Sequence, residues 1–275
     1  MRDDTGTWHH GLIARWWAEF NTPEPEELAY YEAAIRRSGE PALDLGCGTG
    51  RILLPLLAAG LDVDGADISA DMVALASSAA TKAGFSPYLV AQGTHELDLP
   101  RTYRTIYMCG VFGIGGRRDR DLEGLHRAYR HLEPGGTLLI NHELPYEHLD
   151  ERGWARWLPG HGEGIPRAWP EEGDRRTAAN GDEIELINRL FELDPLEQRH
   201  TLEIRARLWR DGKVVVEEEY RLGESLYFVQ EIRLMLAAAG FRDVSVESRY
   251  SGQPASAHDG VVMFVATKTG DADPT

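Results

Sequence analysis

The stretch LDLGCGTGR, residues 43–51, decides the fold because it joins a strand, a glycine turn and the start of a helix. Leu43 and Leu45 flank Asp44 in a short apolar strand, and a further apolar run, residues 52–57, follows the turn. Glycines permit positive φ and let a ligand approach the main chain closely. The unpaired N–H groups in the first turn of the following helix favour polar or negative ligand groups. The stretch therefore predicts a loop that holds a nucleotide-like ligand.

The glycine spacing separates two classes of ligand. A dinucleotide fingerprint reads G-x-G-x-x-G, whereas Gly46, Gly48 and Gly50 form G-x-G-x-G with Asp44 before the first glycine. About twenty residues further on, VDGAD reads as a second strand ending in Asp67, and an acid at that distance suits the two hydroxyls of a ribose. This spacing disfavours a nicotinamide oxidoreductase.

Together, LDLGCGTG and the following VDGADISADMVALA resemble the first two motifs of class I S-adenosylmethionine-dependent methyltransferases. The resemblance implies a role for the glycine turn under the methionine part of the cofactor and for Asp67 at the ribose. Asp44 would orient the turn or meet the cofactor's ammonium through water. The remaining cofactor-binding residues implied by position are Gly46, Cys47 and Gly48 at the methionine and ribose, and Ile68 and Met72 at the adenine.

Later strand ends supply further candidates, because ligands of parallel sheets bind beyond the carboxyl ends of the strands. Thr94 stands where many relatives carry an acid at the adenine amino group, so adenine recognition would pass to the main chain near His95 and Glu96. Cys109, which ends another expected strand, is also a candidate contact of the cofactor. With Cys47 it is one of only two cysteines, so neither a disulfide framework nor a metal cluster is expected.

Composition limits the possible partners. At 275 residues and 42% hydrophobic content the chain can bury a sizeable core. Its net charge of −16, from 29 basic and 45 acidic residues, opposes binding to nucleic acid. It shows no signal segment and no apolar run of ~18 residues, so we expect a cytoplasmic protein without a membrane span.

Alternating strands and helices predict an α/β fold: a seven-stranded, mostly parallel Rossmann-like sheet with helices on both faces. The resemblance implies that its last strand is antiparallel, and an antiparallel β insertion is expected over the active site. The expected domains are an N-terminal helical lid (1–40), the S-adenosylmethionine-binding core (41–143 and 223–268) and a substrate-covering insertion (144–222). Within that insertion, residues 144–180 read as an irregular, tryptophan-bearing excursion, and residues 183–193, 201–210 and 213–222 as strands.

The pairing register of the last two of these strands depends on the length of the loop that joins them. A plain two-residue turn of Asp211 and Gly212 would place Ile204 opposite Glu219 and so put an acid on the apolar face. A three-residue loop or a bulge instead pairs Ile204 with Tyr220. We therefore predict an odd-length loop or a bulge.

Two residues after the fifth parallel strand are candidates for chemistry. His142 is the candidate base or orienting group, although a histidine hydrogen-bonded at a strand end fits equally well, and Glu143 is a second catalytic candidate that would also suit a cationic substrate. Four aromatic residues are candidates for substrate binding, with core packing as their alternative role: Trp17, Tyr30, Phe112 and Trp169.

The predicted function is methyl transfer from S-adenosylmethionine to an oxygen or nitrogen of a small molecule, in a natural-product setting. The alternative is a protein of the same fold that binds the cofactor in a non-methylating or regulatory role. The expected partner is a small-molecule methyl acceptor, and a second copy of the chain, forming a homodimer, is a further candidate partner. No metal is expected, because neither His95-Glu96 nor His142-Glu143 continues into H-E-x-x-H.

Overall fold

The computed structural model describes residues 7, 9–145 and 164–269, and the chain forms two compact units. One unit comprises Met1–Asn21, Gly113–Arg118 and Tyr146–Leu226, and the other comprises Thr22–Phe112, Asp119–Pro145 and Tyr227–Thr275. The N-terminal segment expected to act as a lid is thus shared between the two units. Its role as a lid, and the expected domain boundaries, stay predictions.

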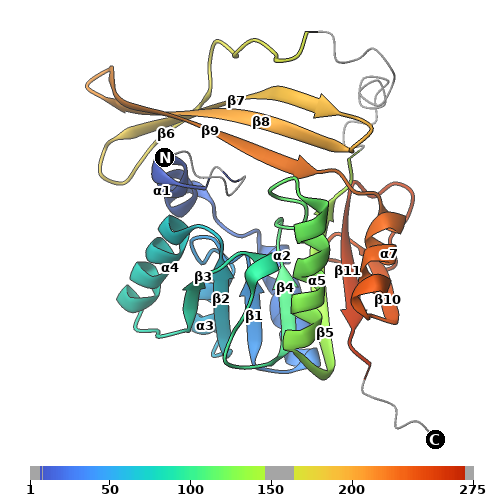
Figure 1. Ribbon diagram of the computed structural model, residues 1–275. Helices are drawn as coiled ribbons and strands as arrows, with labels where there is room; N and C mark the ends of the chain where they lie inside the picture. Colours follow the sequence, from blue (N-terminus) through green and yellow to red (C-terminus); the bar gives the residue numbers. More distant parts are fainter. Residues whose placement is uncertain (1–6, 8, 146–163, 270–275) are drawn as a thin grey trace, which may run out of the picture. The chain divides into compact units, whose positions relative to one another are not determined.

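The larger unit is built on a seven-stranded sheet in the order β10-β11-β5-β4-β1-β2-β3 (Figure 1). β11 runs antiparallel to both of its neighbours, while β1 to β5 pair in parallel, which confirms the expected sheet and its antiparallel last strand. The strands are β1 (Ala42–Leu45), β2 (Val63–Asp67), β3 (Leu89–Ala91), β4 (Tyr103–Met108), β5 (Leu132–Glu143), β10 (Asp243–Ser248) and β11 (Val261–Thr267).

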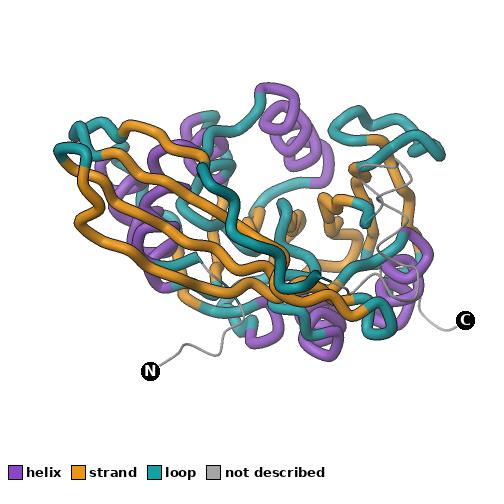
Figure 2. Tube along the Cα trace, turned by 90° about the horizontal axis from the view of Figure 1, so that it is seen from above, coloured by secondary structure: helices purple, strands orange, loops and turns teal. Residues whose placement is uncertain are grey.

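Helices lie on both sides of this sheet (Figures 1 and 2), so its central strands are buried on both faces. One core cluster joins Tyr31 and Ile35 on the second helix to Leu53, Tyr107 and Leu139. The helices are α2 (Pro25–Ser38), α3 (Leu53–Ala58), α4 (Ala70–Lys82), α5 (Arg118–His131) and α7 (Val229–Ala239), with a short 3₁₀ turn, η1 (Thr94–Glu96).

The smaller unit packs helix α1 (Gly11–Phe20) on one face of a four-stranded antiparallel sheet. The sheet order is β6-β7-β8-β9, formed by β6 (Asp174–Thr177), β7 (Glu183–Asp194), β8 (Arg199–Arg210) and β9 (Lys213–Ser225). Leu12 and Trp16 of α1 pack against Ile184, Ile204 and Leu208. The insertion is therefore an antiparallel sheet, as expected.

Strand β6 corrects one expectation, because residues 144–180 were expected to be irregular. Residues Asp174–Thr177 pair with Leu186–Glu183 of β7. The segment DRRT is polar and exposed throughout, so it lacks the alternation by which strands are recognised. Two of the tryptophans in this segment, Trp154 and Trp157, lie outside the described residues.

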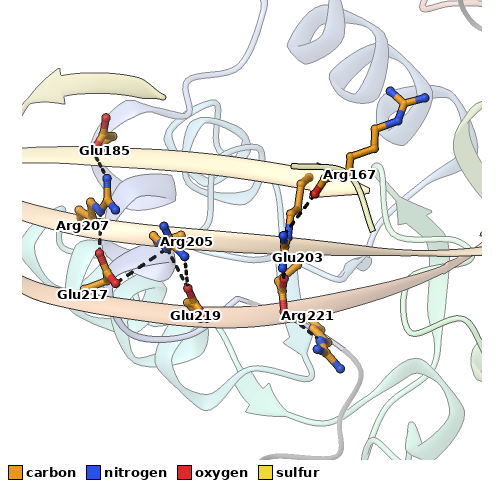
Figure 3. Close-up of polar contacts among 9 residues, drawn as sticks. Arg167, Glu185, Glu203, Arg205, Arg207, Glu217, Glu219 and Arg221 are labelled. Atoms are coloured by element: carbon orange, nitrogen blue, oxygen red, sulfur yellow. Dashed lines mark hydrogen bonds and ion pairs between the residues drawn. The ribbon is translucent and has the colours of Figure 1, made fainter. Parts of the chain in front are cut away.

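The opposite face of the small sheet carries charges in register (Figure 3). Arg207 lies between Glu185 and Glu217, with Nε 2.7 Å from the Glu217 carboxylate. Ion pairs also join Arg205 to Glu219, and join both Arg189 and Arg221 to Glu203. We call this set the arginine–glutamate ladder: Glu185, Arg189, Glu203, Arg205, Arg207, Glu217, Glu219 and Arg221.

The turn between β8 and β9 contains two residues and is followed by a bulge. Arg210 pairs with Lys213 across Asp211 and Gly212, whose φ angles are 50° and 71°, as a type I′ turn requires. The register then shifts, so that Ile204 pairs with Tyr220 as predicted. The bulge adds one residue to β9 and thereby restores apolar residues to the apolar face. The bulge prediction is confirmed, and the alternative of a three-residue loop is wrong.

Candidate functional site

The glycine turn begins at the end of β1 and is hydrogen-bonded to the end of β2. The N–H groups of Gly46 and Cys47 both donate to the Ala66 carbonyl, at 2.7 and 3.0 Å. Gly46 has φ of 92°, and a Cβ there would lie 2.3 Å from Cγ2 of Val111, so no side chain fits. Gly48 has φ of 53° and nothing lies within 4 Å of the position of its absent Cβ. At Gly46 the turn is closed by packing against Val111, whereas at Gly48 the side-chain position is open.

Asp67, at the end of β2, is oriented by main-chain donors. Its Oδ2 accepts from Gly48 N at 2.9 Å and its Oδ1 accepts from Ser69 N at 2.8 Å. Ser69 in turn caps helix α4 by accepting from Met72 N at 3.3 Å. The carboxylate therefore ties the glycine turn to the start of α4.

Asp44 is a buried acid next to the glycine turn. It is only 2% exposed, and burial raises its pKa to about 7, with Tyr107 and Arg51 opposing that rise and Asp67 adding to it. Such a group changes charge near neutral pH, and its charge responds to any cation placed beside it.

Arg51, the last residue of the opening stretch, forms an ion pair that the sequence did not reveal. Its guanidinium binds Glu27 of α2 through both nitrogens, with Nη2 2.8 Å from Oε1. The same Glu27 oxygen accepts from the Cys109 thiol and the Tyr250 hydroxyl, each at 3.0 Å. Although burial opposes ionisation, these donors lower the pKa of Glu27 to about 2. The network tethers α2 to the glycine turn.

Cys109 therefore lies in this network, where burial and Glu27 raise the pKa of its thiol to about 12. A thiol with that pKa is not a nucleophile at neutral pH. In the sequence, only the opposite charges of Glu27 and Arg51 point to this network. Glu27 and Tyr250 are separated from Arg51 by 24 and about 200 residues of sequence, and no spacing rule connects them.

The residues that follow β3 gather around Gly93. A Cβ on Gly93 would lie 2.8 Å from the His95 ring and 3.2 Å from Cδ1 of Ile68, so these two side chains meet at this glycine. Burial, with Arg120, lowers the pKa of His95. Thr94 turns instead toward α5, where its Oγ1 would lie 2.8 Å from a Cβ on Gly124. Glu96 is exposed except for a 3.6 Å approach to His95.

His142 and Phe112 come together with Tyr227. His142 is 7% exposed and its Nε2 lies 3.0 Å from the Tyr227 carbonyl oxygen. Since a carbonyl only accepts, Nε2 carries the proton. The Phe112 ring lies 5.1 Å from Tyr227 and 6.3 Å from His142, and the Tyr227 hydroxyl donates to Asp121 at 2.7 Å. Glu143 is the exposed neighbour of this cluster.

The other aromatic candidates are divided between the two units. Tyr30 is buried on α2 and donates its hydroxyl to Glu247 at 2.7 Å. Trp17 belongs to α1, with its ring 5.8 Å from His9. Trp169 belongs to the same unit as Trp17, where Arg189 and Arg205 of the ladder each lie 4.3 Å from its ring.

Among the described residues, no group of three or more His, Cys, Asp or Glu side chains is arranged to hold a metal ion. In the same part of the chain, no helix combines the length and apolarity needed to cross a membrane.

Comparisons with known proteins agree with this geometry. Residues 42–136 match the family described as a methyltransferase domain. A protein of Geobacillus sp. (strain WCH70), provisionally named a methyltransferase, is 23% identical over 239 residues, covering 85% of this chain and 86% of its own.

Two solved structures illustrate the shared fold. An S-adenosylmethionine-dependent methyltransferase from Clostridium acetobutylicum superimposes with a TM-score of 0.69 at 15% identity, covering 94% of this chain and 98% of its own. CalS10, an amino pentose methyltransferase from Micromonospora echinaspora, gives 0.63 at 20% identity, covering 96% and 99%.

The family domain spans the glycine turn, Asp67 and the strands that carry them. Residues 42–136 therefore form a methyltransferase domain, and the chain has the fold of the S-adenosylmethionine-dependent methyltransferases. Both of these solved structures are described with S-adenosylmethionine.

Proposed function

We propose that this methyltransferase acts on a nitrogen or oxygen of a small polar molecule of the amino-sugar kind, in a natural-product setting. CalS10 is named for an amino pentose, and KedS8 from Streptoalloteichus sp., of the same fold, is named as a sugar N-methyltransferase. The net charge of −16 favours a neutral or cationic acceptor over a polyanion. The observation that carries the proposal is the glycine turn joined to Asp67 in a chain that also has a four-stranded insertion.

The chain's own residues fit the cofactor. The open position at Gly48 lets a ligand approach the main chain, and the Asp67 carboxylate beside it is held by two N–H donors. Asp67 would bind the ribose hydroxyls, and Gly46, Cys47 and Gly48 would line the methionine and ribose. Asp44, which is buried and titrates near neutrality, would stabilise the cofactor's ammonium through water.

The adenine would bind where Ile68 and His95 meet at Gly93, with Met72 and the main chain of Thr94 and Glu96 beside it. Cys109 would act indirectly, because its thiol donates to Glu27, which holds Arg51 of the glycine turn.

The bound cofactor supplies an electrophilic methyl group on a sulfonium, which leaves as a neutral thioether. The protein's task is then to align the acceptor, and good alignment contributes ~7–11 kcal/mol in oriented reactions. A base is needed only where the acceptor must lose a proton. His142, whose Nε2 donates to the Tyr227 carbonyl, would act as the base or orient the acceptor, and Glu143 would attract a cationic substrate. Trp17, Tyr30, Phe112 and Trp169 are the proposed substrate contacts.

Calorimetric titration tests the cofactor site. S-adenosylmethionine and its demethylated product should bind, and NAD should not. Asp67→Ala should weaken binding at least ~30-fold, because it removes the ribose acceptor and leaves two N–H groups without their partner. Asp71→Ala, in the first turn of α4, is the matched control and should bind like the wild type. Binding of NAD alone would refute the proposal.

A labelled-methyl assay against amino sugars, sugar nucleotides and phenols tests the reaction. Transfer to at least one amine or hydroxyl is expected, and His142→Ala should lower turnover much more than cofactor affinity. Tight cofactor binding without transfer to any member would favour the non-methylating role. Unchanged turnover would remove His142 from the mechanism.

A further inference from the structure

Asp44 and Tyr107 form a buried polar pair beside the glycine turn. The two residues are partners in the parallel register of β1 and β4, so their side chains lie on the same face of the sheet. Asp44 is 2% exposed and Tyr107 is fully buried. The Tyr107 hydroxyl makes no hydrogen bond within the part of the chain that the structure describes. Because buried polar groups are normally hydrogen-bonded, this hydroxyl is an exception that a role in ligand binding would explain.

A neutral group lies on the other side of Asp44. Its partner on β2 is Gly65, and a Cβ there would lie 2.9 Å from Sγ of Cys47, so the thiol occupies the space of a side chain. Burial, and then Asp44 itself, raise the pKa of this thiol well above its ordinary value. Cys47 is therefore neutral at physiological pH and does not change the charge around Asp44.

The charged groups that act on Asp44 carry more negative than positive charge. Burial is the largest influence on this carboxyl and raises its pKa to about 7. Arg51 opposes the rise, as does the Tyr107 hydroxyl, whereas Asp67 at the end of β2 and Glu27 of α2 add to it. The Arg51 guanidinium is itself bound by Glu27 through both nitrogens. In the cofactor-free protein, Asp44 therefore holds its proton below neutral pH.

A cation that binds beside Asp44 would reverse this balance, because it favours the ionised carboxyl. S-adenosylmethionine carries an ammonium group on its methionine part, and the turn that we propose for that part begins just after Asp44 and Leu45. We propose that binding of the cofactor's ammonium expels the proton of Asp44, and that Tyr107 donates its hydroxyl to the carboxylate that forms. This inference rests on the proposed function, and it adds a proton to the binding reaction.

The exchange conserves protons and charge. The O–H bond of the Asp44 carboxyl breaks, its electron pair stays on oxygen, and the proton passes to the solvent buffer. The ammonium and the Tyr107 hydroxyl then stabilise the carboxylate, since hydrogen bonds to an ionised group are strong. Because the ammonium favours the ionised form of Asp44, the affinity for the cofactor should fall as the pH decreases through about 7.

Calorimetry in two buffers of different ionisation enthalpy measures the protons that are released for each ligand bound. At pH 6, where the amino group of the cofactor is charged, the wild type should release about one proton on binding S-adenosylmethionine. Methylthioadenosine, which has the adenosine part but no ammonium, should bind without release. Relative to Asp44→Asn, the wild type should lose about tenfold in S-adenosylmethionine affinity from pH 8 to pH 6.

Three variants assign the proton to its residue. Asp44→Asn has no proton to lose and should bind S-adenosylmethionine at pH 6 without release. Tyr107→Phe should release the proton up to a higher pH than the wild type, because it lacks the hydroxyl that favours the carboxylate. Asp64→Asn is the matched control: Asp64 is a buried acid of β2 with its own cation, Arg101, and its loss should leave the release unchanged.

The outcomes distinguish this inference from the proposed function. Release that requires both the ammonium and Asp44 supports the inference. If Asp44→Asn does not fold or bind, the contrast between the two ligands in the wild type and the shift in Tyr107→Phe decide. Binding of S-adenosylmethionine without release at pH 6, or equal release with methylthioadenosine, overturns the inference but leaves the cofactor assignment standing. Absence of any binding of S-adenosylmethionine overturns both.

Discussion

The carboxylates near the ends of the parallel strands and those of the ladder on β9 lie in opposite environments. In the seven-stranded sheet, Asp44, Asp64 and Asp67 lie at or near strand ends, and the first two are no more than 3% exposed. In the four-stranded sheet, the ladder carboxylates Glu217 and Glu219 are more than 40% exposed beside arginines. A buried carboxylate must either find fixed donors or change its pKa, whereas an exposed one is solvated. The buried Asp44 and Asp64 therefore depend on the protein for their partners, whereas the exposed Glu217 and Glu219 are also solvated.

Substitutions in the glycine turn should destabilise the larger unit most. Gly46→Ala should destabilise the protein by about 5 kcal/mol, because positive φ adds strain and its Cβ would lie 2.3 Å from Val111. Gly60→Ala also adds a Cβ at positive φ, 82°, but with nothing within 4 Å, and should cost only about 1–2 kcal/mol. Urea denaturation measures both, and equal losses would contradict the packing argument.

Asp44 should weaken the fold as the pH rises. Its folded pKa of about 7 lies above the ordinary 3.8, so the folded state holds the extra proton, and its stability falls between about pH 4 and pH 7. The full effect corresponds to about 4 kcal/mol. In the cofactor-free protein, the melting temperature of Asp44→Asn relative to the wild type should therefore be higher at pH 8 than at pH 4. A constant difference between the two proteins would refute the shift.

Glu27 should show the opposite dependence. Its folded pKa of about 2 lies below the ordinary 4.5, so the stability it provides is complete above about pH 4.5 and is lost as the pH falls toward 2. Glu27→Gln should cost about 3 kcal/mol at pH 7. The cost should shrink at pH 3, as followed by denaturant unfolding. Glu32→Gln, on the exposed side of the same helix, should cost less than about 0.5 kcal/mol at either pH.

Substitutions in the arginine–glutamate ladder should change the free energy of unfolding least. Glu219→Gln breaks an ion pair to Arg205 that is 46% exposed on the glutamate side, and should cost about 0.5 kcal/mol. That cost should decrease when unfolding is repeated in 1 M salt. A loss of stability above about 2 kcal/mol that is insensitive to salt would show that Glu219 matters as much as the buried acids, and would remove the contrast between exposed and buried carboxylates.

Local pattern was sufficient for the parallel sheet and its helices. The period-two and period-3.6 signals placed every strand of the larger unit within a few residues, except that β5 begins earlier, at Leu132. The bulge after Asp211-Gly212 also followed from pattern, because only one register keeps apolar residues together. β6 escaped detection because a short, wholly exposed strand has no hydrophobic period.

The sequence predicted the candidate site only where residues of one βαβ unit form it. Gly48 and Asp67 could be linked by their spacing, since a βαβ unit of fixed size brings them together. The Glu27–Arg51 ion pair could not be found in that way, because it joins residues 24 positions apart whose pairing depends on the docking of α2.

The sequence by itself determined the glycine turn, the acid that follows it and the alternation of elements, because these depend on local φ, local hydrogen bonding and hydrophobic period. Only the tertiary structure decided which charges are buried, which are paired and which titrate near neutrality. Those properties depend on desolvation and on partners distant in sequence, such as the burial that raises the pKa of Asp44 and the thiol and tyrosine that reach Glu27.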